Sequence, residues 1–420
     1  MRLAHLKLGT GNNEDFTDVP LWTAQLNIPL RGHKALVKKG QRVRAYQTVA
    51  EHPDPLIGDM HAPAAGVVNN VTCLCIGIAR DPEDHQAELP EGLDLARTPD
   101  NELQGRLKRL GIDLGPLLAP GKVMLINGMS PEPPMAWNSL LFSDFDDVLE
   151  DGLDLLARLR PETTFILVGE KNRKKAPMKL ADLDAVHLPP YYPNNLAPLV
   201  IREVSRRKKI DPATVCCLPV QQLYDLGTVA VYGLPLTETI LSVQMRSRVV
   251  NLGTPLGELL TDQEIPLGPG DLVLNGGPFS GRAVASLQEG VGKHDTGVYM
   301  IRYRTFAPYA KHPCVNCGHC VNICPVALRP DLMTKHLEKG DNSSAAAEGL
   351  ARCLDCGLCA YICVARRPMA QWLKTAKIEL GIDPNLKLTA WDPDTQTVSG
   401  AFGPRPHGLL NVFGLGGKRG

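Results

Sequence analysis

Two runs of cysteine constrain this chain more than any other feature. Eight of its twelve cysteines follow the spacing C-x2-C-x2-C-x3-C, which occurs twice towards the C-terminal end. Three cysteines two residues apart can line one tight loop, while the fourth falls about a helical turn further on and points away. This spacing is typical of sites that hold 4Fe-4S clusters. The runs are Cys314, Cys317, Cys320, Cys324 and Cys353, Cys356, Cys359, Cys363.

The two runs together indicate two clusters that exchange their fourth ligands, as in bacterial ferredoxins. In that arrangement the fourth cysteine of each run binds the cluster of the other run. We therefore expect the chain to carry electrons. The pattern assigns Cys314, Cys317, Cys320 and Cys363 to one cluster, and Cys353, Cys356, Cys359 and Cys324 to the other.

Disulfides and zinc are the alternative uses of these cysteines. Disulfides need an oxidising compartment, and Arg2, Lys7 and Glu14 interrupt the N-terminal text, which is not expected to be a secretory signal. Zinc sites usually present two C-x2-C pairs, whereas each run here has a third and a fourth cysteine. The spacing favours iron-sulfur clusters over both.

The four remaining cysteines fit no cluster loop. Cys73 and Cys75 form C-x-C, and Cys216 and Cys217 are adjacent. Both pairs lie in apolar, strand-like text. We expect them to pack in the interior as small apolar side chains.

Composition sets limits on partners and architecture. Lys plus Arg equals Asp plus Glu at 45 each, so no net charge attracts nucleic acid or an anionic membrane surface. No stretch approaches the roughly 20 apolar residues that span a bilayer. The chain has 39 glycines and 35 prolines in 420 residues, which favours several domains with short strands and many turns.

The sequence before the cysteine runs has two parts with different predicted secondary structure. Residues 34–68 suggest short strands and resemble the barrel-sandwich hybrid of biotinyl and lipoyl domains. The expected hairpin tip, residues 57–61, has no lysine for a prosthetic group, so a docking role is preferred. Helix-like sequences at 102–110 and 146–159 then alternate with strand-like sequences at 123–126 and 164–168. This alternation predicts a largely parallel sheet.

The order of these parts resembles RnfC, the peripheral electron-input subunit of the Rnf complex, and more distantly the flavin-binding subunit of respiratory complex I. Its specific motifs, besides the cysteine runs, are residues 233–243, N-L-G-T-P-L-G-E-L-L from Asn251 to Leu260, and N-G-G-P-F-S-G from Asn275 to Gly281. The resemblance covers the chain to about residue 380.

The resemblance implies a multidomain α+β chain with four folded parts and a tail. The expected parts are an N-terminal barrel-sandwich hybrid at 1–95, a central α/β domain at 96–228, a β-grasp (soluble-ligand-binding) module at 229–300, a C-terminal α-helical dicluster ferredoxin domain with two 4Fe-4S clusters at 301–382, and a flexible tail at 383–420.

The chain departs from the family where NADH and FMN normally bind. The glycine-rich loop is replaced by residues 110–118, in which Pro116 removes an amide donor and Asp113 adds negative charge. The loop at 127–134 has three prolines, and the loop at 191–196 has no glycine. These departures disfavour NADH and FMN, although the sequence alone leaves both open.

The resemblance implies an iron-sulfur electron-transfer subunit of a membrane-bound, ion-translocating oxidoreductase, rather than an independent enzyme. It implies a peripheral position on the cytoplasmic side of the inner membrane, with integral membrane and other Rnf-type subunits as partners. A ferredoxin or cytochrome would then donate or accept electrons, and no nucleic acid is involved. The alternatives are an NADH dehydrogenase subunit that retains FMN through Asn127 and Glu132, and a structural adaptor whose clusters only stabilise the fold.

Two arginines follow the second cysteine run. Val364 replaces the proline expected after Cys363, and Arg366, Arg367 and Pro368 come next. Positive charge near a cluster would raise its reduction potential or attract a partner. A solvated basic patch is the alternative.

Overall fold

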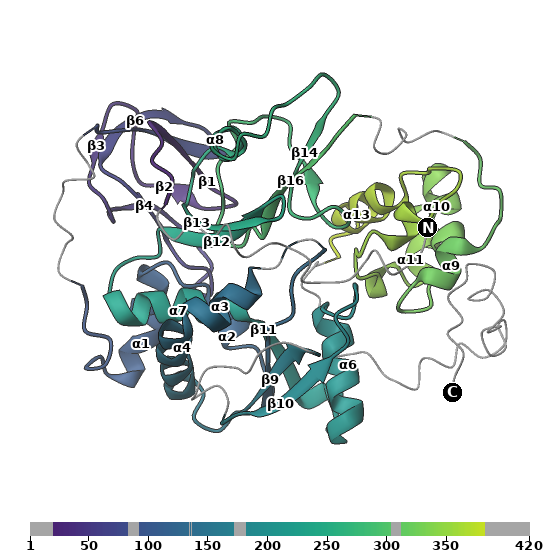
Figure 1. Cartoon of the computed structure of the whole chain (residues 1–420), viewed down its shortest axis with the longest axis horizontal. Coiled ribbons are helices and arrows are strands. Elements are labelled where there is room, and N and C mark those ends of the chain that lie inside the picture. Colours follow the sequence, from purple (N-terminus) through teal and green to yellow (C-terminus); the bar gives the residue numbers. More distant parts are fainter. Residues whose placement is uncertain are drawn as a thin grey trace.

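The computed structural model of the chain describes residues 20–82, 92–133, 135, 137–171, 182–303 and 312–382. Figure 1 shows N-terminal strands at one end, helices around a central sheet, a second strand-rich part above it, and the cysteine-bearing helices at the other end. The expectation of a multidomain chain that mixes helices and strands is confirmed. The tail expected at 383–420 and the charged N-terminal residues lie outside the described residues.

The N-terminal strands form two small sheets around one apolar core. A four-stranded sheet has the order β1-β7-β6-β3, and a three-stranded sheet has the order β2-β4-β5. Alternate side chains such as Leu26 and Ile28 on β1, and Ile76 and Ile78 on β7, are fully buried between them. The strands are β1 Gln25–Pro29, β2 Lys34–Ala35, β3 Arg42–Val43, β4 Thr48–Glu51, β5 Met60–His61, β6 Gly66–Val71 and β7 Cys75–Arg80.

The central part is a parallel sheet of order β10-β9-β8-β11 with helices on both faces, as the alternating text predicts. Its buried runs of Val, Leu and Ile suit strands that are covered on both sides. The elements are α1 Asp100–Arg109, α2 Leu114–Leu117, β8 Val123–Asn127, α3 Asn138–Asp144, α4 Asp146–Leu159, β9 Thr164–Glu170, β10 Asp184–Leu188, α6 Ala197–Lys208, a 3-10 turn at Pro212–Thr214, β11 Val215–Pro219 and α7 Val220–Tyr232.

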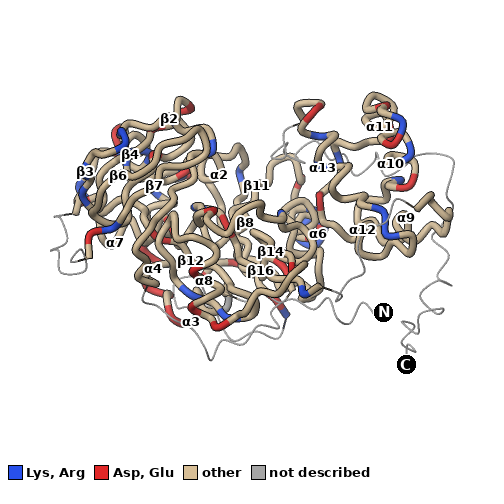
Figure 2. Tube along the Cα trace, turned by 90° about the horizontal axis from the view of Figure 1, so that it is seen from above, with Lys and Arg blue, Asp and Glu red and all other residues tan. Residues whose placement is uncertain are grey.

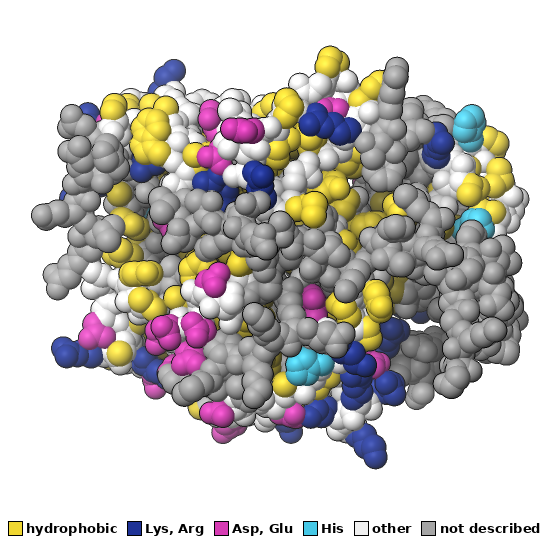
Figure 3. Space-filling view, in the orientation of Figure 1, with side chains coloured by type: hydrophobic (Ala, Val, Ile, Leu, Met, Phe, Trp, Pro, Cys, Tyr) yellow, Lys and Arg dark blue, Asp and Glu magenta, His cyan; other side chains and the backbone are white. Residues whose placement is uncertain are grey.

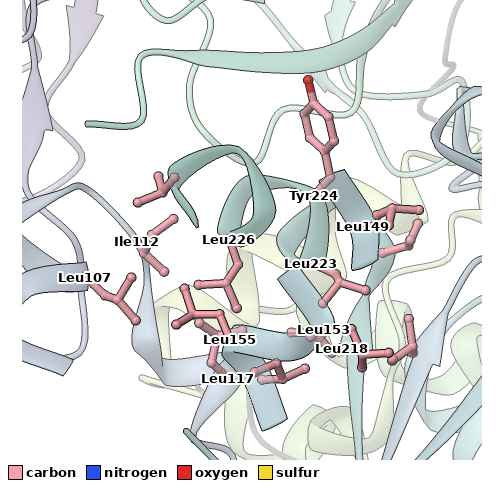
Figure 4. Packing of buried hydrophobic residues seen from close by; sticks show 14 of the residues in the cluster. Leu107, Ile112, Leu117, Leu149, Leu153, Leu155, Leu218, Leu223, Tyr224 and Leu226 are labelled. Carbon is pink, nitrogen blue, oxygen red and sulfur yellow. The ribbon is translucent and has the colours of Figure 1, made fainter. Parts of the chain in front are cut away.

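Helices α4 and α7 pack very closely on one face of this sheet. A Cβ atom on Gly227 would lie 1.9 Å from the Val148 carbonyl oxygen, and one on Gly152 would lie 2.4 Å from that of Leu223. Glycine at both positions therefore permits the contact. Figure 4 shows the leucines of the two helices facing one another, with Leu107, Ile112 and Leu117 alongside.

The third part is a five-stranded mixed sheet of order β13-β12-β16-β14-β15. Strands β12 and β16 are parallel, and the other neighbours are antiparallel. Its elements are β12 Glu238–Val243, β13 Arg246–Asn251, α8 Leu256–Asp262, β14 Leu272–Asn275, β15 Arg282–Ala283 and β16 Gly297–Ile301.

The cysteine region, residues 312–382, is made of short helices. They are α9 His319–Ile323, α10 Pro330–Glu338, α11 Asn342–Ala347, a 3-10 turn at Leu350–Arg352, α12 Leu358–Tyr361 and α13 Met369–Glu379.

Charged side chains of both signs alternate along the chain, and Figure 2 shows the two colours interspersed in every part. Basic side chains gather at the end of α6, near the lower edge of Figure 3. There Arg207 pairs with Glu203, and Lys208 pairs with Asp184. The positive charges also face the negative end of the helix dipole. The helix end and the two ion pairs therefore explain why basic residues gather here.

The expectation for Cys73 is wrong. Cys73 is exposed, whereas Cys216 is buried and Cys75 and Cys217 are half-buried. The apolar text at 71–78 is not one strand, because Thr72 Oγ1 accepts hydrogen bonds from the amides of Leu74 and Cys75 and turns the chain between β6 and β7. Cys73 lies in that turn.

A buried lysine joins the first three parts. The ammonium of Lys293 donates to the carbonyl oxygens of Gly58 at 2.8 Å, Asp59 at 3.0 Å and Gly111 at 2.7 Å. Its side chain is 6% exposed, and Asp113 Oδ1 lies 3.6 Å away. Burial lowers the pKa of Lys293, while Asp113 opposes that change. The hairpin between β4 and β5 is thereby fixed against the stretch that follows α1.

We predict that Lys293→Met lowers the free energy of unfolding by about 3 kcal/mol, since three buried carbonyls lose their donor. Urea unfolding of the whole chain, with amide hydrogen exchange at residues 56–61, measures the effect. Lys108→Met is the matched control, because Lys108 pairs with the same Asp59 from a site that is 20% exposed; about 1 kcal/mol or less is expected. Equal effects of the two variants would contradict the role of Lys293.

Candidate metal centres and the edge of the parallel sheet

The eight cysteines of the two runs surround two cavities. Cys324, Cys353, Cys356 and Cys359 line one of them, and Cys314, Cys317, Cys320 and Cys363 line the other. We call these groups the Cys324 set and the Cys363 set. The structure thus brings the fourth cysteine of each run to the first three of the other run.

The two runs share one backbone conformation, which explains how each loop turns its sulfur atoms to one side. Left-handed residues recur at the same offsets from the first cysteine of each run, and Asn, Asp and Gly tolerate this conformation best. The glycines among them directly precede helices α9 and α12. The pairs are Asn316 and Asp355 (φ 55° and 52°), Gly318 and Gly357 (74° and 71°), and Ala327 and Arg366 (54° and 51°).

The donor chemistry of both sets fits an iron-sulfur cluster. Each iron of a 4Fe-4S cubane takes one thiolate, and each cavity offers four thiols. Burial raises the pKa of Cys353 to about 12 and that of Cys356 to about 11, so a bound cation is needed to hold them as thiolates. Within the described residues, no group of three or more His, Cys, Asp or Glu is arranged around a single metal ion.

The two sets differ in exposure. Cys317 is exposed, and the neighbouring Val315 and Val364 are 61% and 59% exposed, so the Cys363 set opens to the surface. Cys324 is buried, and Cys356 packs with Leu358 against the core beneath the parallel sheet. Each set thus has one buried cysteine, Cys320 or Cys324, and the sets differ because the Cys363 set also has an exposed one, Cys317.

Aromatic side chains join the Cys324 set to the sheet. The Tyr192 hydroxyl donates to the Cys356 carbonyl oxygen at 2.8 Å. The Tyr192 ring stacks on Phe279 with 5.0 Å between centroids, and Phe279 meets Tyr361 edge-on at 5.1 Å. Burial raises the pKa of Tyr192 well above its usual value, so the hydroxyl keeps its proton as a donor. Sequence reasoning missed this contact, because its residues are far apart in the chain.

The carboxyl edge of the parallel sheet is closed by bonds between its own loops. Asn127 Nδ2 donates to the Asn195 carbonyl oxygen at 2.8 Å, and the Ser130 amide donates to Glu170 Oε1 at 2.9 Å. The amide side chain of Asn195 donates in turn to the Pro131 carbonyl oxygen. Ligands in open α/β sheets bind at this edge. Here Asn127 Nδ2, the Ser130 amide and Asn195 Nδ2 have protein partners, while Asn195 Oδ1 has none among the described residues.

Glu132 holds the N-G-G-P-F-S-G loop over the same edge. Its carboxylate accepts hydrogen bonds from the Phe279 amide at 2.8 Å, the Ser280 amide at 3.0 Å and the Ser280 hydroxyl. Burial raises the pKa of Glu132, and these hydrogen bonds oppose the rise. A Cβ on Gly277 would lie 2.3 Å from Glu132 Oε2, which explains why glycine stands there. The two residues that an FMN site would use, Asn127 and Glu132, thus contact protein.

Residues 113–115, in the stretch where the sequence predicts that the glycine-rich loop is replaced, are also bound by another part of the chain. The amides of Leu114 and Gly115 donate to the Leu56 carbonyl oxygen at 2.8 and 3.3 Å, and Asp113 Oδ1 accepts from the Gly58 amide at 2.8 Å. A side chain on Gly58 would meet the Gly111 backbone at 2.3 Å. The N-terminal hairpin therefore uses the amide donors that a phosphate would need.

The structure separates the two arginines after the second run. Arg366 is exposed, whereas Arg367 is 1% exposed and lines the cavity of the Cys363 set.

Lys377 is a second buried cation that sequence reasoning missed. Its ammonium donates to the Cys353 carbonyl oxygen at 2.5 Å and to Asp355 Oδ2 at 2.8 Å. The sequence did not indicate this, because a lysine at this position of a helix is usually exposed at the surface.

Comparisons with known proteins give the relatives of this chain. No family model matches it. It is 26% identical over 406 residues to the RnfC component of the ion-translocating oxidoreductase complex of Rhodobacter capsulatus, covering 85% of this chain and 78% of that protein. It is 28% identical over 374 residues to the protein of the same name from Pseudomonas aeruginosa, covering 76% of this chain and 48% of that protein. For the Pasteurella multocida protein the identity is 25%, covering 82% and 46%.

Among solved structures, the chain matches an NAD+-reducing NiFe hydrogenase in the H2-reduced state with a TM-score of 0.39 and 15% identity, covering 66% of this chain and 57% of that one.

These findings define the chain as a relative of a component of a redox complex. It is a divergent homologue of RnfC of the ion-translocating oxidoreductase complex, and the resemblance to that family is confirmed. The match spans about half of the longer relatives. In the part of the chain that the structure describes, no helix is long and apolar enough to cross a bilayer.

We predict that Glu132→Ala loosens the loop over the sheet edge, because the amides of Phe279 and Ser280 lose their buried acceptor. Loss of one such bond is worth about 1 to 3 kcal/mol, so the Phe279 and Ser280 amides should exchange about ten times faster or more, as measured by hydrogen exchange and mass spectrometry. Glu132→Gln keeps an acceptor oxygen and serves as the control with a smaller effect. Unchanged exchange in Glu132→Ala would show that other contacts hold the loop.

Proposed function

We propose that this protein is an iron-sulfur electron-transfer subunit of an Rnf-type complex that couples electron transfer to ion translocation. The observation that carries the proposal is the grouping of eight cysteines into two interleaved sets around two cavities, in a homologue of RnfC. The proposed cofactors are two 4Fe-4S clusters, one in each set.

The residues of the chain would hold and insulate the two clusters. When bound, a 4Fe-4S cluster accepts and passes on one electron at a time. Apolar side chains such as Leu328 and Met333 line the cavity of the Cys324 set, and Val364 and Met369 line that of the Cys363 set. Cys359 packs against apolar residues of both sets. Apolar side chains packed on Cys359 would therefore stand between the two sets.

The exposure of the two sets suggests where electrons enter and leave. The Cys324 set lies against the parallel sheet, and the Cys363 set has Cys317 at the surface. A redox protein such as a ferredoxin or a cytochrome would exchange electrons at this exposed end. The remaining partners are integral membrane and other subunits of the complex, with this chain peripheral on the cytoplasmic side of the membrane.

We further propose that the sheet edge no longer takes NADH or FMN. This proposal is supported because the Leu114 and Gly115 amides, Asn127 and Glu132 are bound by other parts of the chain. The rival is an NADH dehydrogenase subunit with an atypical flavin site.

We also propose a finer assignment of the folded parts. The N-terminal sheets would form a barrel-sandwich hybrid, the mixed sheet a β-grasp module, and the cysteine region a dicluster ferredoxin domain.

Anaerobic purification followed by iron, sulfide and flavin assays tests these alternatives. We expect about eight irons per chain, from two four-iron clusters, with no released flavin and no bleaching by NADH. Both signals should be reduced by dithionite in a redox titration. A yellow flavin released on denaturation, or bleaching by NADH alone, would favour the rival. Clusters that cannot be reduced at biological potentials would favour a structural adaptor.

Paired serine variants test which cysteines share a cluster. If the fourth ligands are exchanged, Cys324→Ser combined with Cys356→Ser disturbs one cluster and retains about half of the iron. Cys324→Ser combined with Cys317→Ser disturbs both clusters and loses more. Cys73→Ser is the control, since this exposed thiol belongs to neither set. The reverse ranking of the two double variants would show that each run holds its own cluster.

A further inference from the structure

Arg367 is a buried cation at one of the two candidate cluster sites. It lines the cavity of the Cys363 set and is 1% exposed, which makes it the largest of the fully buried side chains among the described residues. Nη1 donates to Thr334 Oγ1 at 3.0 Å, and Nη2 lies 2.5 Å from Glu338 Oε2. The guanidinium also lies 5.2 Å from the centre of the Trp372 ring. These contacts fix it beside the cavity.

The charges that line the two cavities are unequal. At the Cys324 set the lining acid is Asp355, which pairs with Lys377 at 2.8 Å. At the Cys363 set the lining acid is Asp331, which pairs with Arg329 at 2.8 Å. Arg367 itself lines the second cavity, whereas Lys377 and Arg329 line neither cavity.

The partner of Arg367 cancels only part of its charge at the cavity. Glu338 is 39% exposed and does not line the cavity, whereas Arg367 is 1% exposed and does. Water screens an exposed charge much more than a buried one. The cavity of the Cys363 set is therefore lined by one acid and one base, whereas the cavity of the Cys324 set is lined by one acid and no base, so the Cys363 set has the less negative surroundings.

We propose that Arg367 sets the reduction potential of the cluster bound by the Cys363 set above that of the cluster bound by the Cys324 set. Reduction adds one negative charge to a cluster, and a nearby buried cation stabilises that charge. One electron would then pass from the cluster of the Cys324 set, which is oxidised, to that of the Cys363 set, which is reduced, with no proton transferred. Electrons would run from the sheet side toward exposed Cys317. The inference rests on the proposed clusters.

Arg366 provides a matched control beside Arg367. It carries the same charge one position earlier in the chain, but its side chain is exposed. Removal of its charge changes the sequence charge equally, while the change at the cavity is screened by solvent. A difference between the two variants therefore reports burial and position.

The test is an anaerobic redox titration of the full chain, followed by electron paramagnetic resonance. Arg367→Gln should lower the potential of one cluster and leave the other in place, Arg366→Gln should shift it much less, and Arg367→Lys should lie between Arg367→Gln and the parent protein. Iron and sulfide content of each variant must match the parent. Absence of clusters in the parent would refute the proposed function itself, before this inference is tested.

Glu338→Gln gives a second test with the opposite sign at a more exposed position. Loss of this carboxylate leaves Arg367 without its counter-charge, so the same cluster should rise in potential. The inference is overturned if Arg367→Gln, with full iron content, shifts neither cluster beyond Arg366→Gln or shifts both equally. If Arg367→Gln fails to hold its clusters, an unchanged potential in Glu338→Gln overturns it.

Discussion

The buried ammonium of Lys293 decides how the first three parts of this protein fit together. A cation can leave water only where several acceptors replace its hydration, and here the acceptors come from the hairpin tip at Gly58 and Asp59 and from Gly111. That requirement brings the tip onto the stretch after α1. Amides that could otherwise meet a phosphate then bind Leu56. Docking of the N-terminal part and the binding of these amides are one structural fact.

The same need for partners governs the polar groups at the sheet edge. Asn127, Glu132 and Asn195 bind neighbouring loops, because buried donors and acceptors need partners. With its edge closed, the parallel sheet instead supports the cysteine region through Leu358 and the contact from Tyr192 to Cys356. The parallel sheet thereby becomes a platform beside the Cys324 set.

Local sequence patterns predicted the features that depend on local physics. The helix expected at 146–159 is α4, and the runs at 123–126 and 164–168 lie in parallel strands β8 and β9, because apolar spacing and strand composition act over a few residues. The prediction for Cys73 is wrong because the side chain of Thr72 stabilises a turn within an apolar stretch of sequence. Lys293, Tyr192 and Lys377 gave no signal, since the groups that they bind are distant in sequence.

The sequence by itself determined the chemistry of the cysteine runs: eight thiols at two repeated spacings, with left-handed turns favoured at Asn316, Gly318, Asp355 and Gly357. Only the tertiary structure decided which thiols stand together, which set faces the surface, and which of two adjacent arginines is buried. Spacing is a property of the chain and is fixed by covalent geometry. Burial and the charge that acts at a cavity depend on segments that meet only when the chain has folded.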